Sequence, residues 1–415
     1  MGEDPKARLV HTYVVFGLLG SSVSIIGVHA YEAAETFDRA SVAAAVLQFR
    51  FTGALLGSLA PTVLCRWFHG GTVLSMLLAV KIAALALLVF GDSTLVATYL
   101  GDFLLGLTTG GCLVYLSTQA VQPREGRSSS LTVTTQQASF GLGATLSLAI
   151  ASLNLAPAKW PISTTVFGAL LVSFAAVTIW SLPASFRSGP GRAPKPLIPP
   201  AWSRSAAPTR VRTMALLYLP LYAAVFLYAG VENGWTGWLY TWLTQTAGTS
   251  GQAMEPLLLL ACFWGMVTIG RSAAVLVMGK YRRIRKEVLG IASAALVALA
   301  SALACLNLGF YPILALAAFI GPIYPAILSV FGGLPHSGYL AIAMTSLAST
   351  FGSTLVASNM GDVIRSAGPA SFPGAMAALG LVLVLSMLLA AAVTRTVPSA
   401  LGRTEAAEGV HQKSS

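Results

Sequence analysis

The sequence predicts an all-α membrane protein whose twelve transmembrane helices form two six-helix halves related by pseudo-two-fold symmetry. Hydrophobic residues make up 55% of the 415 residues, whereas Asp, Glu, Lys and Arg together reach only 9%, against about 25% in a soluble protein. Apolar runs recur along the whole chain, and short motifs repeat half a chain apart. Because so few charged residues cannot coat a water-soluble globule of this size, lipid must cover much of the surface.

Apolar runs long enough to cross a bilayer are the first of these observations, since one crossing takes about 20 residues. The candidate spans are residues 11–30, 41–64, 72–90, 95–118, 130–153, 161–181, 213–243, 256–279, 287–305, 309–331, 339–360 and 372–394. The connections between them are short. The sequence therefore leaves no room for a second, soluble domain.

Motif repeats indicate that the two halves arose by internal duplication. One pair of matches is 212 residues apart and the other 211: Phe51 and Gly53 with Phe263 and Gly265, and Phe140-Gly141 with Phe351-Gly352. Each match places a span on the span six positions later. Parallel repeats of six spans describe one large class of secondary transporter.

The domain organisation follows from the longest polar stretch, residues 182–212, which is rich in Pro, Ser and Arg. This composition is typical of a flexible linker. We predict an N-terminal half over 1–181, a cytoplasmic linker over 182–212, a C-terminal half over 213–394 and a cytoplasmic tail over 395–415.

Basic residues are distributed unevenly between the two sides of the predicted bundle. If the N-terminus is cytoplasmic, 19 of the 25 Lys and Arg residues fall on the inner side, 3 on the outer side and 3 inside spans. We predict an inner-membrane protein, and the positive-inside rule then places both of its termini in the cytoplasm. A net charge of +11 suggests nucleic-acid binding in a soluble chain, but here the bases lie where lipid headgroups attract them, so we expect no nucleic-acid partner.

Motifs for nucleotide hydrolysis, metal binding or covalent catalysis are absent from the sequence. It contains no GxxxxGK[ST] loop, HExxH, CxxC pair or GxSxG elbow. The four cysteines lie in or beside apolar runs and show no disulfide framework. We therefore expect no enzyme activity, no catalytic residue, no metal site and no cofactor, with an ion gradient, of protons rather than sodium, as the energy source.

Several segments resemble the fucose:proton symporter branch of the major facilitator superfamily and the related sodium-dependent glucose transporter-like proteins. The segments are FLYAGVENGWTGWL (226–239), FWGMVTIGR (263–271), GPIYPAILS (321–329) and FGLGA (140–144). The resemblance implies the superfamily fold, a central cavity between the halves and sugar uptake.

The sequence differs from this family at two places, and both differences bear on the function that the resemblance implies. The loop between spans 2 and 3 keeps an arginine, Arg66, a candidate gating residue, without the acid that accompanies it in the superfamily. Span 4 reads Gly111-Cys112-Leu113-Val114-Tyr115 and lacks the carboxylate that the branch places after such a turn. Export of a polar or anionic metabolite is therefore an alternative to sugar uptake.

Charged residues inside spans are the main candidates for a site, because each costs about 2.5–3.5 kcal/mol at the bilayer centre unless it faces inward or is paired. In the N-terminal half these are Arg50, Asp102 and, more weakly, Lys81. Their positions along the spans put all three near one depth. Two interpretations of these charges stay open. They form either a structural ion pair or a titratable network that binds substrate. All three together carry a net charge of +1, which would favour an anionic group of the substrate.

The C-terminal half offers a corresponding pair, Glu232 and Arg271. Asn233, Trp235 and Trp238 follow the acid in a span interrupted by glycines, which is tolerated where a helix lines a cavity. The alternatives are interfacial anchoring for the tryptophans and a purely structural arginine. Secondary cavity candidates are Lys81, Gln136, Gln137, Trp238 and Tyr324.

Together these features predict a monomeric secondary transporter that moves a small polar solute, sugar-like or anionic, across the bilayer by alternating access. We expect Arg50, Asp102, Glu232, Asn233, Trp235 and Arg271 to bind substrate, and Asp102 or Glu232 to carry the coupled proton. A metabolite or drug exporter is the alternative within this class. A non-transporting membrane receptor or scaffold is the alternative from another class.

Overall fold

The computed structural model describes residues 5–412 except 92–93, 122–128, 154–160, 188–207, 251–254, 282–284, 307, 309 and 332–338. In these residues the chain forms α-helices and one short 3-10 helix, with no strand. The helices are α1 (Pro5–Ser24), α2 (Ile26–Thr36), α3 (Ser41–Leu64), α4 (Gly70–Phe90), α5 (Leu95–Val121), α6 (Ser129–Ser152), α7 (Ile162–Arg187), α8 (Pro208–Ser250), α9 (Pro256–Lys280), α10 (Lys286–Ala304), α11 (Tyr311–Phe331), α12 (Tyr339–Ala367), η2 (Pro369–Ser371) and α13 (Phe372–Gln412).

The twelve predicted spans are confirmed, with differences at four places. The first span is broken at Ile25 into α1 and α2. Helix α7 continues to Arg187 and α8 begins at Pro208, a residue suited to the first turn of a helix, so both ends of the predicted linker are helical and its centre lies outside the described residues. Helix α13 extends to Gln412 and takes in most of the predicted tail.

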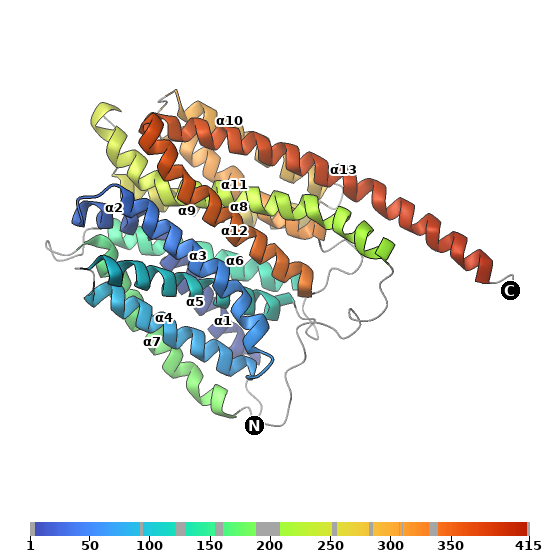
Figure 1. The fold of residues 1–415 in the computed structure, drawn as a ribbon, viewed down its shortest axis with the longest axis horizontal. Coiled ribbons are helices and arrows are strands. Elements are labelled where there is room, and N and C mark those ends of the chain that lie inside the picture. The colour runs from blue at the N-terminus through green and yellow to red at the C-terminus, as the bar shows by residue number, and fades with distance from the viewer. Residues whose placement is uncertain are drawn as a thin grey trace.

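The packing of the helices repeats itself in the two halves, which lie one above the other in Figure 1. In the N-terminal half α3 packs on α5, α1 on α6 and α4 on α7. The same three pairs six spans later, α9 on α11, α8 on α12 and α10 on α13, pack in the C-terminal half. This correspondence is the pseudo-two-fold architecture that the sequence predicts.

Glycines bring the paired helices unusually close together. A Cβ atom on Gly106 of α5 would lie 1.9 Å from the carbonyl oxygen of Arg50, and one on Gly57 of α3 would lie 1.9 Å from that of Leu107. In the other half, a Cβ on Gly270 of α9 would lie 2.1 Å from the Ala318 carbonyl oxygen of α11. Helices in lipid associate through such close packing, because burial of apolar surface supplies little driving force there.

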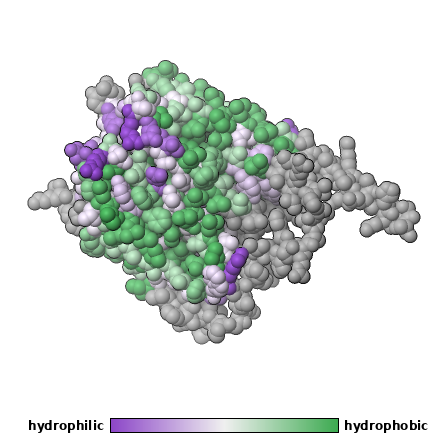
Figure 2. All heavy atoms as spheres, in the orientation of Figure 1, coloured by the Kyte–Doolittle hydropathy of each residue, from purple (hydrophilic) through white to green (hydrophobic). Residues whose placement is uncertain are grey.

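The outer surface of the bundle is suited to lipid. Figure 2 shows a face that is mostly hydrophobic, with most hydrophilic residues toward the upper left of the view and a few toward the lower right. Large apolar side chains such as Val172, Leu276 and Leu385 are 65–72% exposed. Nine helical segments of the described residues are long and apolar enough to cross a membrane, and a surface of this kind is stable only in contact with hydrocarbon.

Contacts between the halves gather at the end of the bundle that carries the turn from α2 to α3. Gly27 of α2 lies so close to α8 that a Cβ atom would be 2.6 Å from the Thr236 carbonyl oxygen. The Tyr31 and Tyr240 rings meet edge-to-face with centroids 5.4 Å apart. Helices α3 with α12 and α6 with α9 also pack across the boundary. At this end the two halves are in direct contact.

Candidate functional site

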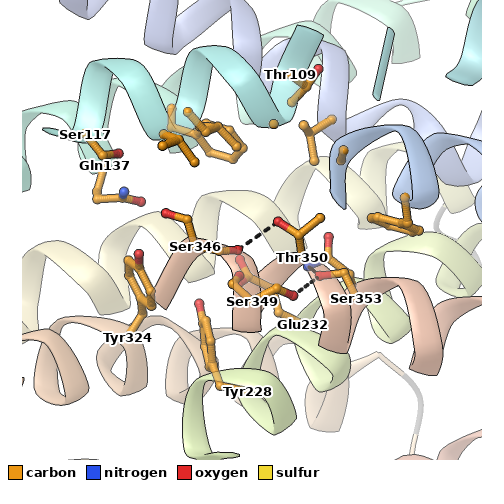
Figure 3. A pocket seen from close by; sticks show the side chains of 18 of the residues that line it. Thr109, Ser117, Gln137, Tyr228, Glu232, Tyr324, Ser346, Ser349, Thr350 and Ser353 are labelled. Carbon is orange, nitrogen blue, oxygen red and sulfur yellow. Dashed lines mark hydrogen bonds between the residues drawn. The ribbon is translucent and has the colours of Figure 1, made fainter. Parts of the chain in front are cut away.

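A cavity that is partly open to the outside lies between the two halves. Helices α1, α3, α5 and α6 line it from one half, and α8, α9, α11 and α12 from the other. Its lining residues are Val23, Phe51, Ala54, Thr109, Gly110, Leu113, Val114, Ser117, Gln137, Phe140, Tyr228, Glu232, Asn233, Trp264, Arg271, Tyr324, Ser346, Ser349, Thr350 and Ser353. In Figure 3, Thr109, Ser117 and Gln137 lie on one side of the space and Tyr228 and Tyr324 on the other.

An ion pair between Glu232 and Arg271 forms the charged part of the cavity wall. Both residues are 6% exposed, and the Arg271 Nη2 contacts Glu232 Oε1 directly. The same Nη2 donates to the Tyr228 hydroxyl at 2.9 Å. Because Tyr228 precedes Glu232 by four residues on α8, both side chains lie on one face of that helix. The structure thus brings together the acid and the base that the sequence singled out in this half.

Arg271 also connects the two halves. Its Nη1 lies 3.5 Å from Oε1 of Gln137 on α6, while its Nε has no hydrogen-bond partner among the described residues. A buried guanidinium with a free donor can accept a further oxygen ligand. Arg271 therefore joins the two halves while one of its donors is not used by any described residue.

Hydroxyl groups form a polar stripe on α12, opposite the N-terminal half. Ser346, Ser349, Thr350 and Ser353 follow the spacing of one helix face and all four line the cavity. Asn233 of α8 extends this stripe, since its Nδ2 donates to Ser353 Oγ at 2.9 Å. The sequence prediction of Asn233 as a cavity residue agrees with its position, whereas the hydroxyl stripe was missed, although serines and threonines at this spacing in an apolar run are a readable signal.

Arg50 and Asp102 form a second ion pair, but it does not line this cavity. The Arg50 Nε donates to Asp102 Oδ1 at 2.8 Å, and the Arg50 Nη1 donates to the Ser22 carbonyl at 3.2 Å. Asp102 is 0% and Arg50 4% exposed. Since Ser22 belongs to the last turn of α1, Arg50 also satisfies a carbonyl at the helix break that precedes α2.

His29 is the member of this network that the sequence analysis missed. Its Nε2 lies 3.0 Å from Asp102 Oδ2, and its Nδ1 lies 3.2 Å from the Ser163 hydroxyl. A histidine within the first apolar run was the available signal. The network therefore ties α2 to α5 and α7 and gives Asp102 two basic neighbours.

Lys81 is not part of that network, although the sequence suggested a shared layer. Its Nζ donates to the Thr109 hydroxyl at 2.7 Å and lies 5.2 Å from the centroid of the Phe174 ring. Lys81 itself is 0% exposed. It approaches the cavity from behind α5, through Thr109.

The predicted tryptophans lie outside the cavity lining. Trp235 is fully buried against Phe372, with ring centroids 4.8 Å apart. Trp238 is 4% exposed and donates from Nε1 to the Ala357 carbonyl of α12 at 2.7 Å. Both rings fill contacts between helices, so they neither line this cavity nor anchor the protein at the lipid surface.

Of the remaining predicted residues, some line the cavity and others do not. Gln136 donates to the Leu116 carbonyl of α5 at 3.3 Å and joins helices, whereas Gln137 faces the cavity. Tyr324 lines the cavity and stacks on Tyr228, with centroids 5.6 Å apart. Arg66 is exposed in the turn between α3 and α4. All four cysteines are free thiols.

Comparison with solved structures identifies the architecture. No family model and no curated protein sequence matches the chain. The crystal structure of the human organic anion transporter MFSD10 (TETRAN) superposes with a TM-score of 0.62 and 15% identity, covering 92% of this chain and 100% of that one. The crystal structure of a variant of the E. coli fucose:proton symporter FucP superposes with a TM-score of 0.60 and 14% identity, covering 94% of this chain and 98% of that one. The repeated helix packing and both superpositions lead to one conclusion, that this chain has the fold of the major facilitator superfamily.

Proposed function

We propose that the protein is a secondary active transporter that moves a small polar solute across the inner membrane by alternating access. The observation that carries the proposal is the Glu232–Arg271 ion pair in the wall of a cavity shared by both halves. Two proteins with the same fold are described as an organic anion transporter and a fucose:proton symporter, which supports a sugar-like or an anionic substrate here.

The position of the contacts between the halves supports an alternating mechanism. The halves pack closely where Gly27 meets α8, whereas Ser117 and Ser346 line the cavity nearer the opposite end of the bundle. Rocking the halves would separate the packed end and close the other. The contact between Arg271 and Gln137 crosses from one half to the other, so the charge pair and the motion are linked.

Glu232, rather than Asp102, is the carboxylate we assign to proton coupling. Glu232 lines the cavity, while Asp102 is fully buried between Arg50 and His29. A carboxylate that exchanges its proton needs access to water and a partner that changes with the transport cycle. Glu232 meets both requirements through the cavity and through Arg271.

Replacing Glu232 with glutamine is expected to abolish solute accumulation driven by a proton gradient while leaving solute exchange. Exchange without net flux moves no proton, so it does not need the titratable group. Both activities are measured in proteoliposomes with a panel of sugars and organic acids, with and without an imposed pH gradient. Glu255→Gln, which removes an exposed carboxylate at the start of α9, is the matched control.

The outcome decides between transport and the alternatives. Accumulation by the Glu232→Gln variant equal to that of the parent would remove Glu232 from the coupling step. Absence of any gradient-driven flux in the parent would favour the receptor or scaffold. Against that alternative, five charged residues inside spans are energetically costly, and a protein without transport function would be more stable with leucine at those positions. Flux only from the cytoplasmic side would indicate an exporter, which the missing carboxylate in span 4 favours.

The orientation in the membrane is tested by reporter fusions. The excess of basic residues on one side predicts that reporters fused after Arg212 and after Lys413 both lie in the cytoplasm. A phosphatase reporter should be inactive and a fluorescent protein active at both positions. Periplasmic activity at either position would contradict the predicted orientation.

A further inference from the structure

Lys81 is a buried cation without a carboxylate partner. No Asp or Glu of the described residues forms an ion pair with it, and its ammonium donates one hydrogen bond, to the Thr109 hydroxyl at 2.7 Å. A buried ion without a counter-ion is costly, and an apolar residue of similar size would be more stable there. The lysine is therefore not explained by the stability of the fold.

The wall between Lys81 and the cavity is only one side chain thick. Thr109 contacts Lys81 on one side and lines the cavity on the other. Its neighbour Gly110 also lines the cavity. Because the Thr109 hydroxyl already donates to the Leu105 carbonyl at 2.7 Å, its oxygen accepts from Lys81 and holds the ammonium directly behind the cavity wall, where its positive charge acts through space.

The other charges around the cavity cancel in pairs. Glu232 neutralises Arg271, and Asp102 neutralises Arg50. His29 beside Asp102 adds charge only when it is protonated. Among the charges inside spans that the structure describes, Lys81 is left without a counter-ion, so the cavity wall at Thr109 has a positive potential in a medium of low dielectric.

The opposite wall determines what else the ligand must carry. Ser346, Ser349, Thr350 and Ser353 line the cavity from α12, with Asn233 beside them. Figure 3 shows Thr109 across the space from these hydroxyl-bearing side chains. Hydroxyls and amides both donate and accept hydrogen bonds, as the hydroxyls of a solute do.

We infer that Lys81, acting through Thr109, makes the cavity selective for hydroxylated organic anions. The acidic group of the solute lies against Thr109, and its hydroxyls face the stripe on α12. This inference rests on the proposed transport function and names its substrate class. Lys81 is a positioning residue, because it acts on the solute through the threonine.

The test compares acid and neutral members of matched pairs, glucuronate with glucose and galacturonate with galactose. Uptake and counterflow are measured in proteoliposomes for the parent and for Lys81→Met, which keeps the volume and removes the charge. We expect the parent to prefer the acid of at least one pair about 10-fold or more. Lys81→Met should raise the KM for that acid by about 10- to 100-fold, the range expected for one charge acting across a side chain over roughly 6–12 Å at an effective dielectric of about 20. The KM for the neutral sugar should stay unchanged.

Two further measurements separate this role from a structural one. The melting temperature of Lys81→Met should equal or exceed that of the parent, because the variant no longer buries an unpaired charge. Thr109→Val should weaken acid transport in the parent but add nothing in the Lys81→Met background, since the two residues act as one unit. Lys286→Met, which removes an exposed lysine, should leave the acid preference unchanged.

The results that would overturn the inference differ from those that would overturn transport itself. Preference of the parent for the neutral sugars, or an equal effect of Lys81→Met on both members of a pair, would leave a transporter but exclude anion selection by Lys81. A lower melting temperature or loss of folding in Lys81→Met would make the lysine structural. Absence of flux for every solute with the parent would instead remove the proposed function.

Discussion

Replacing Arg50 alone with leucine is expected to destabilise the protein by about 3–5 kcal/mol, whereas the double change Arg50→Leu with Asp102→Leu restores both folding and transport. The single change leaves the fully buried Asp102 carboxylate without its arginine and with His29 as its remaining neighbour. Breaking a buried ion pair by removing one partner is strongly destabilising, while replacing both partners by apolar residues is often neutral. Transport returns in the double variant because neither residue lines the cavity.

The melting temperature in detergent and liposome uptake, measured side by side, check this expectation. Arg39→Leu, which removes an exposed arginine before α3, is the control and should change stability by no more than about 0.5 kcal/mol. A double variant that folds as well as the parent but transports nothing would contradict us. It would restore the reading in which Arg50 or Asp102 binds the solute or carries the proton.

Replacing Arg271 with methionine is expected to abolish transport and to destabilise the protein by a similar 3–5 kcal/mol. Glu232 would be left buried and unpaired, and the cavity would lose the donor that reaches Tyr228 and Gln137. Arg271→Lys keeps the charge but not the planar fork that contacts these partners on several sides. It should therefore fold nearly as well as the parent and transport far more slowly.

A charge-exchanged variant separates stability from function at this pair. Glu232→Arg combined with Arg271→Glu keeps an ion pair between α8 and α9 and should recover much of the melting temperature. It should remain inactive, because the guanidinium would extend from α8 in place of α9 and would no longer make the contact of Arg271 with Gln137. Active transport by the exchanged variant would mean that the pair serves the fold alone.

The positions of the helices could be predicted from the sequence because the bilayer imposes a simple requirement on composition. Each crossing must be apolar over about 20 residues, so the runs beginning at Ser41 and at Gly70 are visible in the sequence and recur as α3 and α4. The break at Ile25 was not predicted. It interrupts helical geometry within a span whose mean hydropathy is high across the break, and hydropathy does not report such an interruption.

Part of the candidate site could also be predicted from the sequence. Glu232 and Arg271 are conspicuous because a charge inside a span needs a partner or water, and the structure pairs them. The position of a residue along a span predicts its depth in the membrane but not the direction of its side chain around the helix axis. The sequence therefore could not distinguish Gln137, which lines the cavity, from Gln136, which packs against α5. The same uncertainty placed Trp235 in the site, although its ring packs on Phe372.

The sequence by itself determined which residues must be shielded from lipid, because the energetic cost of a charge in hydrocarbon depends on residue type and depth alone. Tertiary structure decided how each charge is shielded. Arg50 contacts Asp102 and the Ser22 carbonyl near a helix break, Arg271 lines a shared cavity, and Lys81 lies behind Thr109. These differences depend on which helices approach one another and on the glycines that let them come close, and such contacts join residues far apart in the chain.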